Sequence, residues 1–436
     1  YGAYGYALHG KDYRFILAHY YAGTALGTTD PNQIVRVLIA DGAAKFSGAT
    51  SAGSTSLQPS VSYQVTALAD GSLKLVSASG KTVGPLPAPV TVTGSGPLML
   101  AGVGRYRGAL ELRPDGSGGV ETVNSVGLDD YVRGVVAGEM PASWALAALE
   151  VQAVAARTFA ITNHVGGPAY DLYSDTRSQV YGGVGEETAT TDAAVAATRG
   201  QVVTYNGSPV ITYFSASSGG HTESVQFAFP GATPEPWLKG VPDPYDGAGG
   251  NPYHQWRLSM RTAVAAARLG GLVRGTFRGI AVTKHGASPR IVLATIVGSR
   301  GTTTVSGLKL ESVFGLLSTD ATFTTITTLP GPGPAVLAQL RRAERLVNIT
   351  QGAQMVAVLR PFEPAVRLAS GPSLHGSVFP ARRGGQLLVQ VRRRRRWHTV
   401  ARVALGTGGA ITIAVPGPGK YRFVYQGLDG PAVSVS

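Results

Sequence analysis

Residues 128–161 read LDDYVRGVVAGEMPASWALAALEVQAVAARTFAI, and this stretch decides how the fold is interpreted. Two helical segments are predicted here, with a break at GEMP, residues 138–141. Proline has no amide hydrogen and disfavours helical geometry in the residue before it, so we expect the first helix to end near Glu139. Asp129 or Asp130 is the expected cap of the first helix, and Ser143 is the expected cap of the second.

Glu139 is the single carboxylate in this break. The C-terminus of a helix carries the negative end of the helix dipole, which favours the protonated form of a carboxyl group placed there. A glutamate held in that form is suited to general acid catalysis. The structural alternative is a helix-end glutamate paired with a nearby arginine.

The composition predicts a strand-rich protein of several domains. The chain has 436 residues, too many for one compact core, and two or three domains are expected. Its 59 glycines and 27 prolines suit a turn-rich fold. No run approaches the roughly 18 apolar residues of a membrane span. The absence of cysteine excludes disulfides and thiolate–metal sites and is compatible with export. The chain opens at Tyr1 without methionine, and we expect it to be processed or trimmed.

The net charge of +13 is unevenly distributed. From residue 331 to the end, 14 arginines and one lysine face only three acidic residues. The preceding 330 residues carry 23 basic and 22 acidic side chains. The C-terminal part is therefore strongly cationic, and an anionic surface is its expected partner.

Hydrophobic periodicity and turn residues divide the chain into five segments. Helical spacing predicts one or two helices in residues 1–32, and short alternating segments predict a β-rich subdomain over residues 33–125. A core of helices and strands is expected over residues 126–328. A Pro-Gly linker and a short basic helix are expected over residues 329–350. Alternating positions with Gly-Pro turns predict a basic β-sandwich over residues 351–436.

Two local signals predict hairpins. Asn206-Gly207 lies between two strand-like segments and is typical of a tight hairpin turn. The run Arg392 to Arg396 lies between LLVQV and TVARVAL and is expected at the tip and edge of another hairpin. Binding of an anionic polymer and protection of an exposed sheet edge both fit this run. No nucleic-acid-binding module accompanies it, so nucleic acid is not an expected partner.

Several motifs, in a fixed order, resemble the SpoIID/LytB family, which is named for stage II sporulation protein D and an amidase enhancer. They cover about residues 125–325 and read LDDYVRGVVAGEMPASW, LEVQAVAARTFA, SDTRSQVYGG, YFSASSGGHTES, WLKGVPDPYD and SGLKLESVFGLLST. The N-terminal YGAYGYALHGKDYRFILAHYYAGT resembles a segment that closes the domain in many members. Here it precedes the domain, as in a circular permutation, which is feasible because chain ends often lie close together in one fold.

The resemblance implies an α+β fold. A SpoIID-like core of short helices and sheet would be completed by residues 1–32. A β-rich N-terminal subdomain and a C-terminal all-β, Ig-like sandwich would flank it.

The resemblance also implies peptidoglycan chemistry, because the sporulation member is described as a lytic transglycosylase. Ordinary glycosidases use two carboxyl groups. A lytic transglycosylase manages with one, because the 6-hydroxyl of the muramic sugar itself attacks. The glutamate of the family motif corresponds to Glu139, which would then be the sole acid–base residue.

Further substrate-binding candidates each have a structural alternative. Arg157 is either a clamp for a substrate carboxylate or N-acetyl oxygen, or a buried arginine that joins a helix to a loop. Asp175, Gln179 and Tyr181 line either a sugar-binding groove or a tyrosine-packed loop. A further set of candidates either binds sugar or forms a tight turn after a strand: Ser215, Ser217, Ser218, Gly219 and Gly220.

Three more residues complete the candidates. His221 is a candidate to donate a hydrogen bond to substrate or to assist proton transfer, although a lone histidine is more often structural. Asp243 and Asp246, in DPYD, are candidates for a cation site or a second carboxylate, but Asp-Pro turns are more common.

The sequence departs from the family at two positions. Ala147 stands where a glutamate is usual, and Glu150 stands where a lysine is usual. Some members hold a zinc ion through cysteines and a histidine. This chain has no cysteine, so neither a metal nor another cofactor is expected.

Two functions remain open. The first is an exported bacterial lytic transglycosylase, extracellular or in the cell wall, that cleaves peptidoglycan glycan strands and is held on anionic wall polymers by its C-terminal module. The second is a non-catalytic wall-binding protein that localises or stimulates a wall amidase. The motif at Glu139 favours the first function, whereas Glu150 and the basic C-terminal part keep the second open. A lectin-like binder of other polysaccharides is a third, weaker interpretation.

Overall fold

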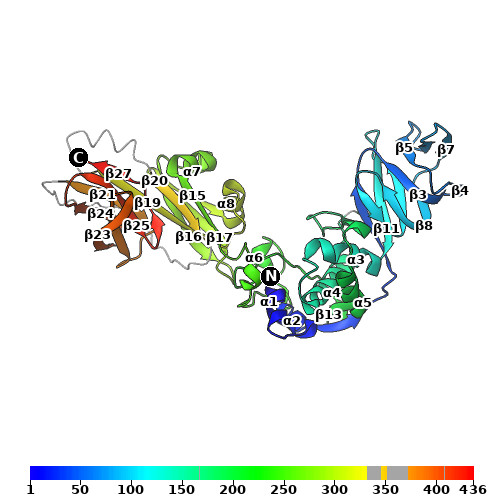
Figure 1. Cartoon of the computed structure of the whole chain (residues 1–436), viewed down its shortest axis with the longest axis horizontal. Helices are drawn as coiled ribbons and strands as arrows, with labels where there is room; N and C mark the ends of the chain where they lie inside the picture. Colours follow the sequence, from blue (N-terminus) through cyan, green and yellow to red (C-terminus); the bar gives the residue numbers. More distant parts are fainter. Residues whose placement is uncertain (166, 331–344, 351–371, 407) are drawn as a thin grey trace. The chain divides into compact units, whose positions relative to one another are not determined.

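The computed structural model describes residues 1–165, 167–330, 345–350, 372–406 and 408–436 (Figure 1). The chain forms two compact units. Unit 1 comprises Tyr1–Ala216 and Glu235–Lys239, and unit 2 comprises Ser217–Pro234 and Gly240–Ser436. Helices and several sheets confirm the α+β class, with a β-rich C-terminal portion. Within the described ranges, no helix is both long and apolar enough to cross a bilayer.

The strands predicted in residues 33–125 belong to a large sheet of unit 1. Its strands are β2 (Ile34–Ala40), β3 (Lys45–Ala52), β4 (Thr55–Ser56), β5 (Tyr63–Ala67), β6 (Leu73–Ser77), β7 (Thr82–Leu86), β8 (Val90–Leu100), β9 (Gly104–Tyr106), β10 (Ala109–Pro114), β11 (Val120–Gly127) and β12 (Leu172–Tyr173). Their order is β12-β2-β11-β10-β8-β3-β5-β6-β7, with β4 on β3 and β9 on β8. In β2 the alternation of the sequence places Val35, Val37 and Ile39 in the core.

The helical part of unit 1 is built around one alanine-rich helix. The elements are α1 (Gly2–Leu8), α2 (Tyr13–Tyr20), α3 (Leu128–Glu139), α4 (Leu146–Thr162) and α5 (Ala189–Ala197), with a sheet of β1 (Ala25–Thr28), β13 (Gln201–Tyr205) and β14 (Ser208–Pro209). Figure 1 shows α3, α4 and α5 side by side. Helix α4 also contacts α1, α2 and β13, and its small side chains allow this close packing. The N-terminal segment thus packs on the core as expected.

One continuous cluster of buried side chains joins the large sheet to the helices. It includes Val37 and Leu110 of the sheet, and Val135 of α3 and Leu149 of α4. Residues 33–125 therefore share a core with the helices and do not form the separate subdomain that we expected. The boundary between units lies at residue 216 instead, inside the core predicted for residues 126–328.

The break between α3 and α4 lies where the sequence predicts it, but the helix caps differ. Helix α3 ends at Glu139, and Met140, which precedes the proline, is extended at φ −135° and ψ 142°. The residues at the cap positions are Gly127 for α3 and Ala145 for α4, and neither helix has a side-chain cap. The predicted caps at Asp129, Asp130 and Ser143 are therefore wrong, because each residue lies off the cap position.

The hairpin predicted at Asn206-Gly207 is confirmed. Both residues have positive φ, 51° and 80°, as a tight turn of this kind requires. Strand β14 contains only Ser208 and Pro209, so the second strand is shorter than expected.

The described residues of unit 2 form three sheets and short helices. The helices are α6 (Val225–Ala228), α7 (Thr262–Leu269) and α8 (Gly307–Phe314). One sheet pairs β16 (Phe277–His285), β17 (Ile291–Gly298) and β18 (Gly301–Ser306). The second runs β15 (Arg257–Arg261), β20 (Arg345–Thr350), β19 (Thr322–Pro330), β21 (Ser373–Phe379) and β24 (Ala410–Ala414). The third runs β23 (Arg396–Ala404), β22 (Gln386–Arg393), β25 (Gly419–Tyr425) and β26 (Leu428–Asp429), with β27 (Val433–Val435) on β25.

The C-terminal module does not begin after a linker at residue 329. Strand β19 runs to Pro330 and pairs with β21, and its Ile326 lies in the same core as Leu374 and Phe423. Strand β20 occupies the end of the range 329–350, where a linker and a short basic helix are predicted. The rest of that predicted helix and of the linker, and the beginning of the predicted sandwich, lie in residues 331–344 and 351–371, outside the described residues.

A fully buried arginine joins the helical elements of unit 1. Arg157 of α4 donates from Nε to Asp129 of α3 at 2.6 Å, and from Nη1 to the Gln201 carbonyl at the start of β13 at 3.0 Å. Burial lowers the pKa of the guanidinium, and Asp129 opposes this effect. This burial fits the interpretation as a buried structural arginine and does not support the predicted substrate clamp, because no part of the Arg157 side chain reaches solvent.

We expect Arg157→Met to lower the free energy of unfolding by about 3–5 kcal/mol, because it leaves Asp129 without its buried partner. Chemical denaturation followed by circular dichroism measures the change. The control is Arg177→Met, whose ion pair with Asp175 is 60% and 50% exposed and contributes about 1 kcal/mol or less. Equal losses in the two variants would contradict the structural assignment of Arg157.

Candidate functional site

Glu139, at the last position of α3, is the centre of the candidate site in unit 1. Its side chain is half-buried, and Oε1 accepts a hydrogen bond from the Val180 amide at 2.8 Å. Burial raises the pKa of this carboxyl group, and the hydrogen bond from Val180 only partly offsets it. Among the described residues, no arginine or lysine forms an ion pair with Glu139. The alternative of a simple arginine pair is thus not supported.

Two glycines on one face of α3 bring the Val180 loop to Glu139. A side chain at Gly134 would meet the Tyr181 ring at 2.6 Å, and one at Gly138 would meet Val180 at 3.1 Å. Positions four residues apart lie on the same helix face, so both glycines open that face to the loop. The spacing of these two glycines is a signal in the sequence that we overlooked.

Buried hydrogen bonds fix the same loop beneath the site. The Tyr131 hydroxyl donates to Gln179 Oε1 at 3.0 Å, and the Tyr181 hydroxyl donates to Asn124 Oδ1 at 2.7 Å. Gln179 is fully buried and Tyr181 is 4% exposed. Their burial fits the alternative of a tyrosine-packed loop and does not support a place for Gln179 and Tyr181 in a sugar-binding groove.

Asp175 lies on the surface of this loop. Its carboxylate accepts two hydrogen bonds from Arg177 Nε, at 2.9 and 3.1 Å, and one from Nη2 at 2.7 Å. These contacts lower its pKa. The Arg177 guanidinium lies 3.8 Å from the centre of the Tyr173 ring. Asp175 is accessible to a ligand, but its partner already neutralises it.

An aromatic cluster adjoins the α3–α4 break. The Tyr4 ring of α1 stacks on Trp144 with centroids 4.7 Å apart, and the Tyr1 ring meets Trp144 edge-on at 4.9 Å. Such contacts add to the energy of area burial. They fasten the N-terminal segment to the residues that follow Glu139.

The Ser-Gly motif is divided between the units. Ser215 is exposed and belongs to unit 1, whereas Ser217, Ser218, Gly219, Gly220 and His221 belong to unit 2. Glu139 also belongs to unit 1.

In unit 2 a buried carboxylate organises the serine-glycine turn. Asp246 accepts hydrogen bonds from Ser217 Oγ at 2.8 Å, the Ser218 amide at 2.7 Å and the Gly219 amide at 3.1 Å. His254 Nδ1 lies 2.7 Å from the same carboxylate. Burial raises the pKa of Asp246, but these hydrogen bonds, led by the one from His254, outweigh it and the pKa is lowered. The turn is thus preformed, with its hydroxyls directed to carboxylates.

Asp243 and His221 are also structural in this turn. The Ser218 hydroxyl donates to Asp243 Oδ2 at 2.7 Å. His221 Nδ1 lies 2.7 Å from the Thr222 carbonyl, while Arg290 donates to the His221 and Ser218 carbonyls at 2.8 and 2.7 Å. Asp243 and Asp246 therefore anchor the turn. The sequence motifs did not point to His254 and Arg290, because nothing in their local sequence indicates a contact with a distant turn.

Two further observations bear on the chemistry of the site. In the described part of the chain, no three histidine, aspartate or glutamate side chains lie close enough together to hold a metal ion. Glu150, which replaces the usual lysine, is half-buried on α4. Burial raises its pKa, Asp12 raises it further and Arg14 lowers it. The departure from the family thus places on α4 a carboxyl group whose pKa is raised.

We expect Gly134→Ala to lower the free energy of unfolding by about 1–3 kcal/mol, because the added methyl group overlaps the Tyr181 ring. Amide exchange at Val180 should also accelerate, since its loop must move away from Glu139. The control is Gly185→Ala, where an added methyl group meets nothing within 4 Å. An unchanged stability in Gly134→Ala would show that the loop does not pack as described.

Comparison with known proteins places the centre of the site in a defined family. The domain described as Stage II sporulation protein matches residues 116–205. An uncharacterized protein of Brachyspira hyodysenteriae is 40% identical over 122 residues, 27% of this chain and 33% of that protein. Stage II sporulation protein D of Bacillus subtilis is 32% identical over 218 residues, 46% of this chain and 61% of that protein. The amidase enhancer of Bacillus subtilis is 43% identical over 111 residues, 26% of this chain and 14% of that protein.

The chain spans less than two thirds of each of these relatives. The matched domain contains α3, α4, α5 and β13, and with them Glu139 and the Val180 loop. The names of the relatives support a cell-wall-related role. The sporulation domain and the named relatives agree with the resemblance carried by the motifs, so residues 116–205 of this chain are similar to the domain of the SpoIID/LytB family.

Proposed function

We propose that the protein is a peptidoglycan lytic transglycosylase with Glu139 as its only acid–base residue. The observation that carries the proposal is the environment of this carboxyl group, which is half-buried at a helix end, has a raised pKa and has one backbone amide as its partner. A general acid that works near neutral pH needs such a raised pKa.

The reaction needs two proton transfers, and Glu139 takes part in both. Protonated Glu139 gives its proton to the glycosidic oxygen as the bond from that oxygen to C1 of the muramic sugar breaks. The 6-hydroxyl of the same sugar forms a new bond to C1 and returns its proton to the Glu139 carboxylate. The products are a 1,6-anhydro-muramic end and a new free hydroxyl end, and no water is consumed. A second carboxylate is therefore unnecessary, in contrast to hydrolytic glycosidases.

The test is digestion of purified, peptide-stripped glycan strands, with mass spectrometry of the products. We expect anhydro-muramic ends from the wild-type chain, and a loss of about 10²–10⁴-fold in Glu139→Gln, because the amide cannot donate the proton. The matched control is Glu311→Gln in unit 2, another half-buried carboxyl group whose pKa burial raises. An equal yield of anhydro ends in wild type and Glu139→Gln would remove Glu139 from the chemistry.

The raised pKa also predicts how pH acts on stability. The folded-state pKa of Glu139 lies above the unfolded value of about 4.3. The contribution of Glu139 to the free energy of unfolding is therefore fully present below about pH 4.3, and it is lost as pH rises through the folded-state pKa. Glu139→Gln should therefore gain stability relative to wild type as pH rises from about 4.3 through the folded-state pKa of Glu139. The measurement is the difference in unfolding free energy across this range, and a difference independent of pH would contradict the raised pKa.

The second candidate is a non-catalytic wall protein that localises or stimulates an amidase. Two observations favour it: the 43% identity to an amidase enhancer over 111 residues, and the glutamate at position 150. The burial of Arg157, Gln179 and Tyr181 also leaves fewer side chains available to a substrate. Absence of anhydro ends, together with faster wall digestion by an added amidase, would favour this candidate. Stimulation that survives Glu139→Gln would make the glutamate structural.

A further inference from the structure

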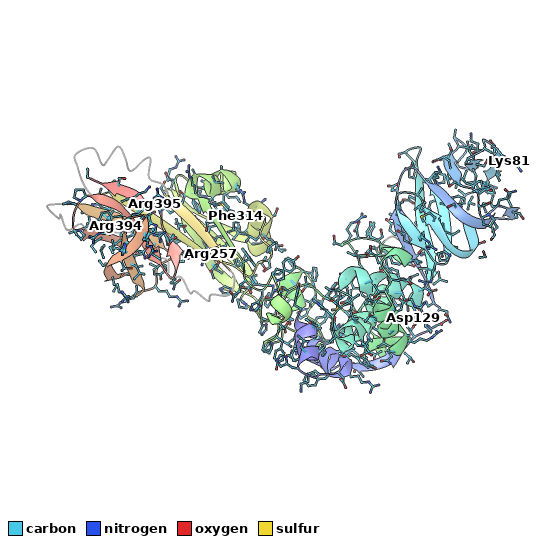
Figure 2. The ribbon with its side chains drawn as sticks, in the orientation of Figure 1. Lys81, Asp129, Arg257, Phe314, Arg394 and Arg395 are labelled. Carbon is cyan, nitrogen blue, oxygen red and sulfur yellow. The ribbon has the colours of Figure 1, made fainter. Side chains whose placement is uncertain are left out.

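The hairpin of β22 and β23 in unit 2 ends in five consecutive exposed arginines, Arg392 to Arg396. Arg394 and Arg395 form the turn, with φ of 45° and 67° (Figure 2). Left-handed backbone is unfavourable for side chains other than glycine, asparagine and aspartate. The same chain uses Asn206-Gly207 where another hairpin needs positive φ. Arginine in both turn positions is therefore costly for the fold.

The strands next to the turn add a second unfavourable feature. Arg393 and Arg396 are directly opposite in the antiparallel register, and like charges in that position repel. From residue 372 to residue 436, nine arginines and one lysine face a single acidic residue, Asp429. Asp429 already pairs with Arg422 at 2.6 Å. In the described part of the chain, no ion pair involves Arg392 to Arg396.

The base of the hairpin, by contrast, is firmly held. The Arg422 guanidinium lies 4.3 Å from the centre of the Trp397 ring, and Arg422 Nε donates to Gln390 Oε1 at 2.9 Å. Trp397 is opposite Arg392 in the register. The arginines are thus presented on a supported hairpin. Arginines that are unfavourable at the turn of an otherwise stable hairpin indicate selection for binding.

We propose that Arg392 to Arg396 bind a linear phosphodiester polymer of the cell wall. Each guanidinium can form two parallel hydrogen bonds to a phosphate, and a polymer with repeated charges engages several arginines at once. The choice of a wall polymer depends on the cell-wall-related role of the family and not on catalysis by Glu139.

Other partners of the hairpin fit less well. Binding to a membrane surface would require apolar side chains at the tip that insert into the bilayer interface, whereas the tip consists of arginines. Single-stranded nucleic acid binds to open aromatic rings, whereas Arg422 already stacks on Trp397. Protection of the β23 edge requires charge along the strand, and it gives no reason for arginine at the two turn positions with positive φ.

The test uses the full chain and poly(glycerol phosphate) as the probe, with affinity measured by calorimetry at several salt concentrations. We expect the double variant Arg394→Asn with Arg395→Gly to bind about tenfold more weakly, since two charged contacts are lost. Asn-Gly suits the turn, so this variant should be at least as stable as wild type, and weaker binding would not reflect unfolding. The matched control, Arg382→Gln with Arg383→Gln, removes the same charge from two other exposed arginines and should bind nearly as wild type.

Four results would overturn the proposal. Equal losses in the two double variants would mean that net charge alone attracts the polymer. Binding that does not weaken with added salt would exclude charge as the driving force. Duplex DNA bound as tightly at equal phosphate concentration would indicate a nucleic-acid site, and preferential binding to vesicles of anionic lipid would indicate a membrane site. Glu139→Gln should bind the polymer unchanged, which separates this test from that of the catalytic proposal.

Discussion

The helical part of unit 1 depends on one buried ion pair. Arg157 reaches from α4 to Asp129 at the start of α3 and to the carbonyl of Gln201 in β13. Removing a guanidinium from water costs several kcal/mol, and only a carboxylate and carbonyls at short range offset that cost. The relative placement of α3, α4 and β13 is therefore narrowly constrained. The end of α3, where Glu139 lies, takes its position from this constraint.

Glu139 combines two kinds of local packing. Glycine on one face of α3 lets the Val180 loop approach until its amide reaches the carboxyl group. The same approach buries the carboxyl group and raises its pKa, while Tyr131 and Tyr181 hold the loop from below. A hydrogen-bond donor and a low-polarity environment thus arise from one contact. In unit 2, Asp246 has the opposite character, because its many donors keep it ionised despite full burial.

Predictions from local sequence succeeded where neighbouring residues alone determine the backbone conformation. Pro141 ends α3 at Glu139, Asn206-Gly207 turns a hairpin, and the arginine run occupies a hairpin tip. They failed where the partner is distant in sequence. The motif cannot reveal that Arg157, Gln179 and Tyr181 face inward, since their partners Asp129, Tyr131 and Asn124 lie 28, 48 and 57 positions away. The prediction of a linker at Pro330 failed for the same reason, because β19 pairs with β21, which lies more than 40 residues later in the sequence.

The position of the N-terminal segment has a consequence for synthesis of the chain. The hydroxyl of Thr204 in β13 donates to the carbonyl of Ala25 in β1, although the two residues are 179 positions apart. At ribosomal rates, β1 therefore waits roughly 10–40 s for its pairing strand to be made. During that interval the exposed apolar side chains of α1 and α2 have no α4 to cover them. Within unit 1, the segment that comes first in the sequence is therefore among the last to be covered.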